Sequence, residues 1–245
     1  VFQVNENNPL VGLEERAKLL NELGQALMKH RYMFEFGDAL RPGNLYDYFL
    51  QRQEKGVLAA REILIAILKS MGEIWPDGSW VDSIAIGDAA YHEAVKRSDI
   101  TNRIVPFHKL SQWMSYSLIE PLQLAGMKII HLDALTGLAE YRNGGLFIDT
   151  GTISLRDKTE METPHDPKSP IIVEWRALTV TLLDQLAEQI RRHTNTNAES
   201  MPLVSILQGG TWSAGRRIAQ RLRSDASPPL RLKSWGTIFV FCFAI

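Results

Sequence analysis

Apolar residues recur every three or four positions between 172 and 193, and this regular pattern constrains the fold more than any other feature of the chain. Such spacing gathers the apolar side chains on one face of an α-helix. Arg191, Arg192 and His193 complement the negative end of the helix dipole. The pattern predicts a long amphipathic helix with a buried stripe made of Val173, Ala177, Val180, Leu183, Ala187 and Ile190.

Weaker forms of the same pattern predict further helices, over residues 13–27, 58–70, 88–96, 106–124 and 214–223. We expect Pro121 to kink or end the helix in which it lies. Short strands are expected at 203–207, 231–233 and 237–241, and the prolines and charges of 157–170 predict a loop. The predicted fold class is mainly α with a few short β-strands, in a single domain covering residues 1–245.

The composition excludes several classes of protein. With 45% hydrophobic and 22% charged residues, the chain fits an ordinary soluble globular protein, and its single cysteine fits a reducing compartment such as the cytoplasm. A formal net charge of -1 gives no reason to expect nucleic acid or an anionic membrane as a partner. Cys242 is the single cysteine, which excludes an internal disulfide framework, and the apolar run at 238–245 is too short to span a bilayer.

Charged groups crowd the segment LDALTGLAEYRNGGLFID at 132–149, which combines Asp133, Glu140, Tyr141, Arg142 and Asp149. We interpret the Asn-Gly-Gly at its centre as the left-handed end of a short helix. Packing alone does not require four charged groups and a tyrosine beside such a turn. The segment is therefore the predicted small-molecule site.

Carboxylates are the best candidates for chemistry, and they are Asp77, Asp88, Glu140, Asp149 and Glu174. Cleavage of a sugar–nitrogen bond builds positive charge on the sugar, and a fixed carboxylate stabilises or attacks that charge. Arg142 and Arg176 could orient these acids or bind a substrate phosphate. The alternative roles are structural, because Asp77 lies in a WPDG turn and Glu174 in the first turn of a helix.

Other motifs leave two interpretations open. His108 lies at a predicted helix start, where it either faces a pocket or forms an ordinary hydrogen bond. The tryptophans either stack on a planar ligand or fill the core, and they are Trp75, Trp113 and Trp212. The glycine-rich segment GGTWSAG at 209–215 binds an anion at a helix start, or is only a tight strand-to-helix turn. Histidine spacing predicts no metal site, and no Walker A, GxGxxG or GxSxG motif is present.

Several motifs in order resemble the Urc4/Urg3-type uracil catabolism proteins of fungi and bacteria. These motifs are IWPDG, VPFHKLSQW, LTGLAEYRNGGLFID, VEWRALTV and GGTW. The resemblance implies a part in a pathway that degrades uracil through its nucleotide and releases a urea unit. It also implies an additional N-terminal portion beyond this chain. The family's acidic DGT-like turn near the C-terminus is replaced here by Ser-Trp-Gly-Thr at 234–237.

A more distant resemblance links AEYRNGG and VEWR to the ADYR and EIR motifs of queuosine salvage nucleoside hydrolases. Those proteins have a helical fold like that of DNA glycosylases. The resemblance implies that Glu140 stands where those enzymes have an aspartate, with Arg142, Glu174 and Arg176 around it.

The sequence thus predicts a hydrolase that cleaves an N-glycosidic bond in a uracil-derived ribosyl or ribosyl-phosphate (ureido) compound, without cofactor or metal. Glu140 stabilises or attacks the sugar cation, and Asp77 or Asp149 positions water. The predicted substrate-binding residues are Arg142, Tyr141, His108, Trp75, Trp113, Glu174, Arg176 and Trp212. The alternative is a non-catalytic protein that binds the intermediate or a partner enzyme of uracil catabolism. A ring-opening amidohydrolase would need a metal, which the histidine spacing disfavours.

Overall fold

The computed structural model describes residues 4–9, 12–75 and 78–233. The helices are α1 (Leu13–Lys29), α2 (Arg31–Phe34), α3 (Leu45–Leu50), α4 (Ala60–Met71), α5 (Lys109–Leu124), α6 (Tyr141–Asp149), α7 (Pro170–Thr194), α8 (Leu203–Ile206) and α9 (Trp212–Leu222). Single turns of 3₁₀-helix occur at η1 (Pro42–Asn44), η2 (Gly72–Ile74), η3 (Leu132–Ala134) and η4 (Lys158–Met161), and η5 (Leu207–Thr211) is a π-helix. The predicted class, mainly α with a few short strands, is confirmed.

In the described ranges of the chain, the strands form four separate pairs. The antiparallel pairs are β1 (Glu35–Phe36) with β2 (Ala39–Leu40), β4 (Ser79–Val81) with β5 (Ile84–Gly87), and β6 (Ala89–Tyr91) with β7 (Ile104–Pro106). The fourth pair, β3 (Val57–Ala59) with β8 (Lys128–Ile130), is parallel, with Leu58 opposite Ile129. Two-stranded ladders of this length are stabilised by the helices on which they pack rather than by themselves.

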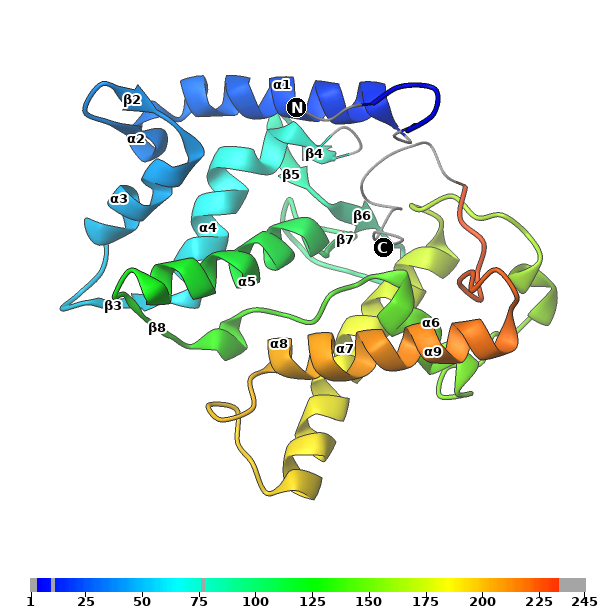
Figure 1. Cartoon of the computed structure of the whole chain (residues 1–245). Helices are drawn as coiled ribbons and strands as arrows, with labels where there is room; N and C mark the ends of the chain where they lie inside the picture. The colour runs from blue at the N-terminus through cyan, green and yellow to red at the C-terminus, as the bar shows by residue number, and fades with distance from the viewer. Residues whose placement is uncertain (1–3, 10–11, 76–77, 234–245) are drawn as a thin grey trace.

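The main core lies between the N-terminal helices and the long helix α7. α4 packs against α1 and α5, and its Ile63 and Ile67 are fully buried. Leu183 of α7 is also fully buried in this core, as the predicted stripe requires. In Figure 1 the run α8–η5–α9 crosses α7 and covers α6. The short helix α6 therefore packs against α7 and α9.

The long-range periodicity identified the long helices correctly. α7 starts at Pro170, a residue whose fixed φ suits the first helical position, and α1 covers the predicted 13–27. α4 begins at Ala60 rather than 58, because Leu58 belongs to β3. α5 begins at Lys109 rather than 106, and Pro121 lies inside its last turn without ending it.

Three local predictions are wrong. The expected helix at 88–96 is β6 and a following turn, because Ala89 and Ala90 pair with β7 and are buried. The expected strand at 203–207 is α8, since a short apolar run does not distinguish strand from helix. The expected glycine-rich turn at 209–215 lies within η5 and the start of α9. Because η5 runs directly into α9, this segment has no free helix N-terminus to bind an anion.

Near the end of the described chain, Leu232 forms a single parallel bridge with His165. The predicted strand at 237–241 and Asp77 lie outside the described residues. Across the part of the chain that the structure describes, none of the helices is both long and apolar enough to cross a membrane.

Candidate functional site

Glu140 caps the N-terminus of α6. Its backbone is extended, and its side-chain oxygens accept hydrogen bonds from the backbone N–H groups of Arg142 at 2.7 Å and Asn143 at 2.6 Å. A carboxylate suits this position because the first N–H groups of a helix lack partners and carry partial positive charge. The Asn-Gly-Gly segment is therefore in the first turns of a helix, and the predicted C-cap is wrong.

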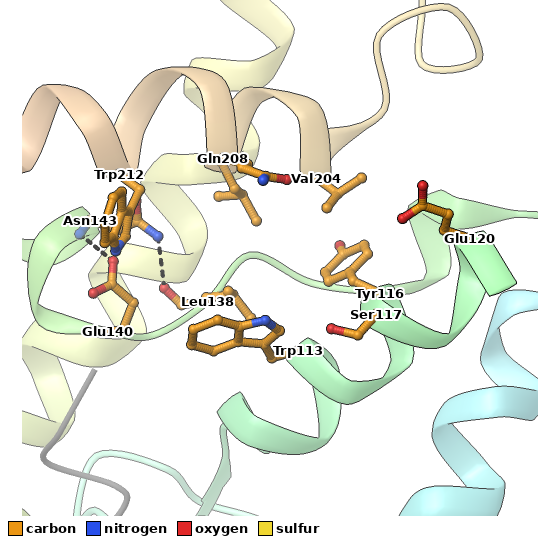
Figure 2. Close-up of a pocket in the computed structure, with 11 residues that line it drawn as sticks. Trp113, Tyr116, Ser117, Glu120, Leu138, Glu140, Asn143, Val204, Gln208 and Trp212 are labelled. Carbon is orange, nitrogen blue, oxygen red and sulfur yellow. Dashed lines mark hydrogen bonds between the residues drawn. The ribbon is translucent and has the colours of Figure 1, made fainter. Parts of the chain in front are cut away.

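A cavity of about 470 Å³ opens beside Glu140, between α5 and the run α8–η5–α9. Figure 2 shows the indole of Trp113 on the α5 side and that of Trp212 next to Glu140. The volume is that of a typical small-molecule site. The lining residues are Trp113, Tyr116, Ser117, Glu120, Leu138, Glu140, Asn143, Val204, Leu207, Gln208 and Trp212.

The π-helix η5 provides the wall opposite α5. It places Leu207 and Gln208 on the cavity, and Trp212 follows at the start of α9. Thr211 of η5 donates a hydrogen bond of 2.8 Å from Oγ1 to Oδ1 of the buried Asn143. Single π-turns inside helices are frequent at functional sites, because they redirect side chains at a cost in regular hydrogen bonding.

Two glycines allow α6 to approach its neighbours closely. A Cβ on Gly144 would lie 2.7 Å from Oγ1 of Thr179 and 2.8 Å from the indole of Trp175, both on α7. A Cβ on Gly215 of α9 would overlap the backbone carbonyl of Arg142. Larger residues at these positions would move α6, and with it the carboxylate of Glu140.

On its other side, Glu140 borders a small cavity of about 40 Å³, which Lys109 and Arg176 also line. Arg176 forms a two-bond ion pair with Asp88, from Nη1 to Oδ1 at 2.9 Å and from Nη2 to Oδ2 at 2.7 Å. The Nε of Arg176 donates to the carbonyl of Ala139 at 3.3 Å, and Lys109 donates its backbone N–H to Asp88 at 3.0 Å. Asp88 thus links α7 and α5, and Arg176 supports the residue that precedes Glu140.

The two buried carboxyls have opposite pKa shifts. Burial raises the pKa of Glu140, while its backbone hydrogen bonds and the charges of Lys109 and Arg142 act in the opposite direction without cancelling it. Burial alone would raise the pKa of Asp88, but the charge and hydrogen bonds of Arg176, together with Lys109, lower it. Two nearby acids with pKa values pushed apart are typical of functional sites.

Three of the predicted site residues, Glu140, Trp113 and Trp212, meet at the large cavity. Tyr141 and Arg176 line the small cavity behind Glu140. Arg142 turns away from both, because its Nη1 donates to the carbonyl of Ala226 at 2.8 Å.

The other predicted site residues lie elsewhere. Asp149, at the opposite end of α6 from Glu140, pairs with Arg223 through two hydrogen bonds of 2.8 and 2.5 Å. Glu174 is largely exposed and contacts Nε2 of His92 at 3.1 Å. Trp75 is buried in the main core, and His108 borders a separate, mainly apolar cavity of about 440 Å³.

The sequence interpretation missed Lys109, Asn143, Gln208 and Glu120. Lys109 is 2% exposed and Asn143 is 1% exposed, values unusual for such polar residues unless they have partners. The sequence gives only a weak signal that Lys109 is buried. This residue lies next to the apolar side of the helix expected to start in VPFHKLSQW. Gln208 could not be found, because its position depends on the π-helix. Among the described residues, no three histidine, cysteine or acidic side chains gather as a metal site would require.

Comparison with known proteins gives one family and two relatives. Residues 1–239 match a family model described as protein of unknown function (DUF1688). The chain is 38% identical over 241 residues to "Protein urg3" of Schizosaccharomyces pombe (strain 972 / ATCC 24843), covering 97% of this chain and 57% of that protein. It is 36% identical over 265 residues to "Uracil catabolism protein 4" of Lachancea kluyveri, covering 97% and 59%. The chain thus spans less than two thirds of each relative, and no solved structure matches it significantly.

Proposed function

The chain belongs to the DUF1688 family, and on that premise we propose that it is a hydrolase of uracil catabolism that cleaves an N-glycosidic bond. The substrate is a uracil-derived ribosyl or ribosyl-phosphate compound, the ureido forms included. The name of one relative, "Uracil catabolism protein 4", supports the pathway.

The observation that carries the proposal is the position of Glu140. Its carboxylate is 5% exposed, held by two backbone N–H groups, and lies on the wall of a cavity of about 470 Å³. Each carboxylate oxygen has a second lone pair after accepting one backbone hydrogen bond. A fixed negative group in a partly desolvated site stabilises developing positive charge better than a mobile, hydrated one.

In the proposed step, the bond between C1′ and nitrogen breaks and its electron pair leaves on the nitrogen. Positive charge then develops on C1′ and the ring oxygen of the sugar, where the Glu140 carboxylate stabilises it. The oxygen of a water molecule adds to C1′. One proton of that water ends on the leaving nitrogen, so the products are a free sugar and the released base or urea.

Lys109 and the Asp88–Arg176 pair are positioning residues in this proposal. Arg176 contacts the carbonyl next to Glu140, and its own orientation is fixed by the two bonds to Asp88. The charge of Lys109 favours the ionised form of Glu140 against the effect of burial. Lys109 thus favours the ionised carboxylate, and the Asp88–Arg176 pair fixes the backbone beside it, as transition-state stabilisation requires.

Trp113 and Trp212 would contact the planar part of the substrate, because both indoles border the cavity (Figure 2). We assign Asp149 to the structure of α6, since both its oxygens bond Arg223 and it lies about 13 Å from Glu140 along the helix axis. Asp77 keeps its proposed role in positioning water. Arg142 is assigned a structural role, because it donates a hydrogen bond to the carbonyl of Ala226.

Two substitutions of Glu140 test the proposal. Glu140→Gln removes the charge and keeps the size, so turnover should fall by about 10²-fold or more while ligand affinity stays similar. Glu140→Asp keeps the charge and remains a good helix cap, but withdraws the carboxylate by one methylene. It should therefore lose rate without losing stability. Chromatographic measurement of released base or urea gives the rate for each protein.

The matched control is Glu188→Gln, an exposed glutamate on α7 that pairs only with Arg191 among the described residues. It should leave turnover unchanged. A Glu140→Gln protein that is folded and turns over normally would disprove the assignment. Tight binding with no turnover in the unsubstituted protein would instead favour the non-catalytic binding protein.

A further inference from the structure

The charged side chains on the described wall of the large cavity are all acidic. Its described lining residues include two carboxylates, Glu120 and Glu140, and no lysine, arginine or histidine. The other lining side chains that carry polar atoms are neutral, and they are Trp113, Tyr116, Ser117, Asn143, Gln208 and Trp212. A cavity built to hold a phosphate normally presents arginine, lysine or a helix N-terminus to it. Here the N-terminus of α6 is already occupied by Glu140.

Glu120 lies at the end of the cavity away from Glu140, near Tyr116 and Ser117 (Figure 2). It is exposed and forms no ion pair with another described residue. Its oxygens are thus available to accept hydrogen bonds from a ligand. The cavity therefore carries an acceptor carboxylate at each end.

The nearest basic residues do not change this balance. Arg176 is bonded to Asp88, and Arg142 to the carbonyl of Ala226. Lys109 is buried behind Glu140, on the small cavity rather than the large one. Arg216 lies over the ring of Trp212, with its Cζ 5.6 Å from the ring centroid, and is not part of the described wall.

A phosphate monoester carries close to two negative charges at pH 7. Repulsion from the buried Glu140 is weakly screened, and repulsion from the exposed Glu120 acts at low salt, so both carboxylates oppose the binding of a phosphate. A sugar hydroxyl or the N–H groups of a base or urea, by contrast, donate hydrogen bonds to the same carboxylates. The wall thus distinguishes ligands by charge.

Resting on the proposed function, we propose that the cavity takes an uncharged ribosyl compound rich in hydrogen-bond donors and rejects its 5′-phosphate, with Glu120 as the specificity-determining residue. This narrows the substrate from ribosyl or ribosyl-phosphate compounds to the ribosyl class. It also places the removal of phosphate before this step, by a reaction of the phosphatase or nucleotidase class.

The test compares uridine with uridine 5′-monophosphate as ligands, using the quenching of tryptophan fluorescence by which Trp113 and Trp212 would report binding. At pH 7 and low salt, the unsubstituted protein should bind uridine at least about tenfold more tightly than the phosphate. Glu120→Gln should reduce this ratio several-fold by improving the phosphate, and Glu120→Lys should invert it. Glu188→Gln is the matched control and should leave the ratio unchanged.

Equal or tighter binding of the phosphate by the unsubstituted protein would overturn the inference, as would a ratio that Glu120→Lys does not alter. If Arg216 instead holds a phosphate, Arg216→Ala will abolish phosphate binding while uridine binding persists, which also overturns it. Selective binding of uridine without turnover of any ribosyl compound would sustain this inference and refute the hydrolase. Turnover of phosphorylated compounds alone would sustain the hydrolase and refute this inference.

Discussion

At the scale of single residues, the site depends on how two buried carboxylates are held. Within the described part of the chain, Glu140 accepts hydrogen bonds only from backbone N–H groups, whereas Asp88 forms an ion pair with Arg176. The first arrangement leaves lone pairs facing a cavity, and the second occupies both oxygens with a guanidinium. Glu140 is thus the acid available for chemistry, and Asp88 is the acid that supports it.

The raised pKa of Glu140 predicts the pH dependence of turnover. Stabilising a sugar cation requires the ionised carboxylate, so kcat/KM should fall as the pH drops through the pKa of Glu140. Because burial raises that pKa, the acidic limb should lie above the range of an ordinary glutamate, about 4.3. A pH–rate profile of the unsubstituted protein measures the limb. A limb at or below the ordinary value would contradict the assignment.

Substitution of Lys109 should shift the acidic limb of the pH–rate profile to still higher pH. The charge of Lys109 favours ionised Glu140, so Lys109→Met, which keeps the apolar stem, should shift the acidic limb to higher pH. If Lys109 were purely structural, Lys109→Met would lower the amount of active protein and leave the pH of the acidic limb unchanged. The comparison of the two pH–rate profiles separates these roles.

Loss of the Asp88 charge should destabilise the fold. Asp88→Asn leaves the half-buried Arg176 without its counter-ion, for which we expect a cost of about 3 kcal/mol, the lower end of the range for buried pairs, and a Tm lowered by roughly 10 °C. The lowered pKa of Asp88 means that its stabilisation is present above the ordinary carboxyl pKa and is lost as the pH falls through the lowered value. Thermal unfolding across acidic pH should therefore show a weaker pH dependence in Asp88→Asn than in the unsubstituted protein.

The acids could be selected from the sequence, but their roles could not. Glu140, Trp113 and Trp212 were predicted for the site and border the same cavity. Asp149 belongs to the same short segment as Glu140, yet it is the last residue of α6 and Glu140 precedes the first. Proximity in the sequence misled because a helix separates its two ends in space.

At the scale of elements, glycine positions set how closely α6, α7 and α9 pack. Gly144 and Gly215 leave no room for a methyl group, whereas Gly24 in α1 has nothing within 4 Å of a built Cβ. Close approach of this kind fixes α6 against two helices. The site therefore depends on backbone contacts that are invisible in side-chain patterns.

Alanine at these glycines should have opposite effects. Gly215→Ala should cost at least about 1–3 kcal/mol, because the methyl group would displace the carbonyl of Arg142. It should also reduce turnover by moving Glu140. Gly24→Ala, the matched control, should stabilise α1 by about 1 kcal/mol and leave turnover unchanged. Urea denaturation gives both values, and equal effects of the two substitutions would contradict the packing described here.

Long helices were predictable and short elements were not. The period of α7 extends over many residues, so local exceptions do not obscure it. β6 and α8 are three and four residues long, and their structures depend on contacts with other elements, β7 and α7, rather than on their own sequences. The π-helix η5 required the same tertiary information, although Gly209 and Gly210 marked the place where the helix departs from regularity.

At the scale of the whole molecule, α5 and the run α8–η5–α9 bring together segments from the middle and the end of the described chain (Figure 1). The cavity between them holds Glu140 at one end and Glu120 at the other. The relatives are substantially longer than this chain, since it covers 57% and 59% of them.

The most direct test of the N-glycosidase proposal follows the C1′ proton of the sugar by NMR. Ring-opened uridine, its 5′-phosphate, uridine and uridine monophosphate are each mixed with the protein and with Glu140→Gln. We predict new anomeric signals of free ribose from a ribosyl compound with the unsubstituted protein, and none with Glu140→Gln. Line broadening of a ligand with no new anomeric signal from any of the four compounds would contradict the account and indicate a binding protein.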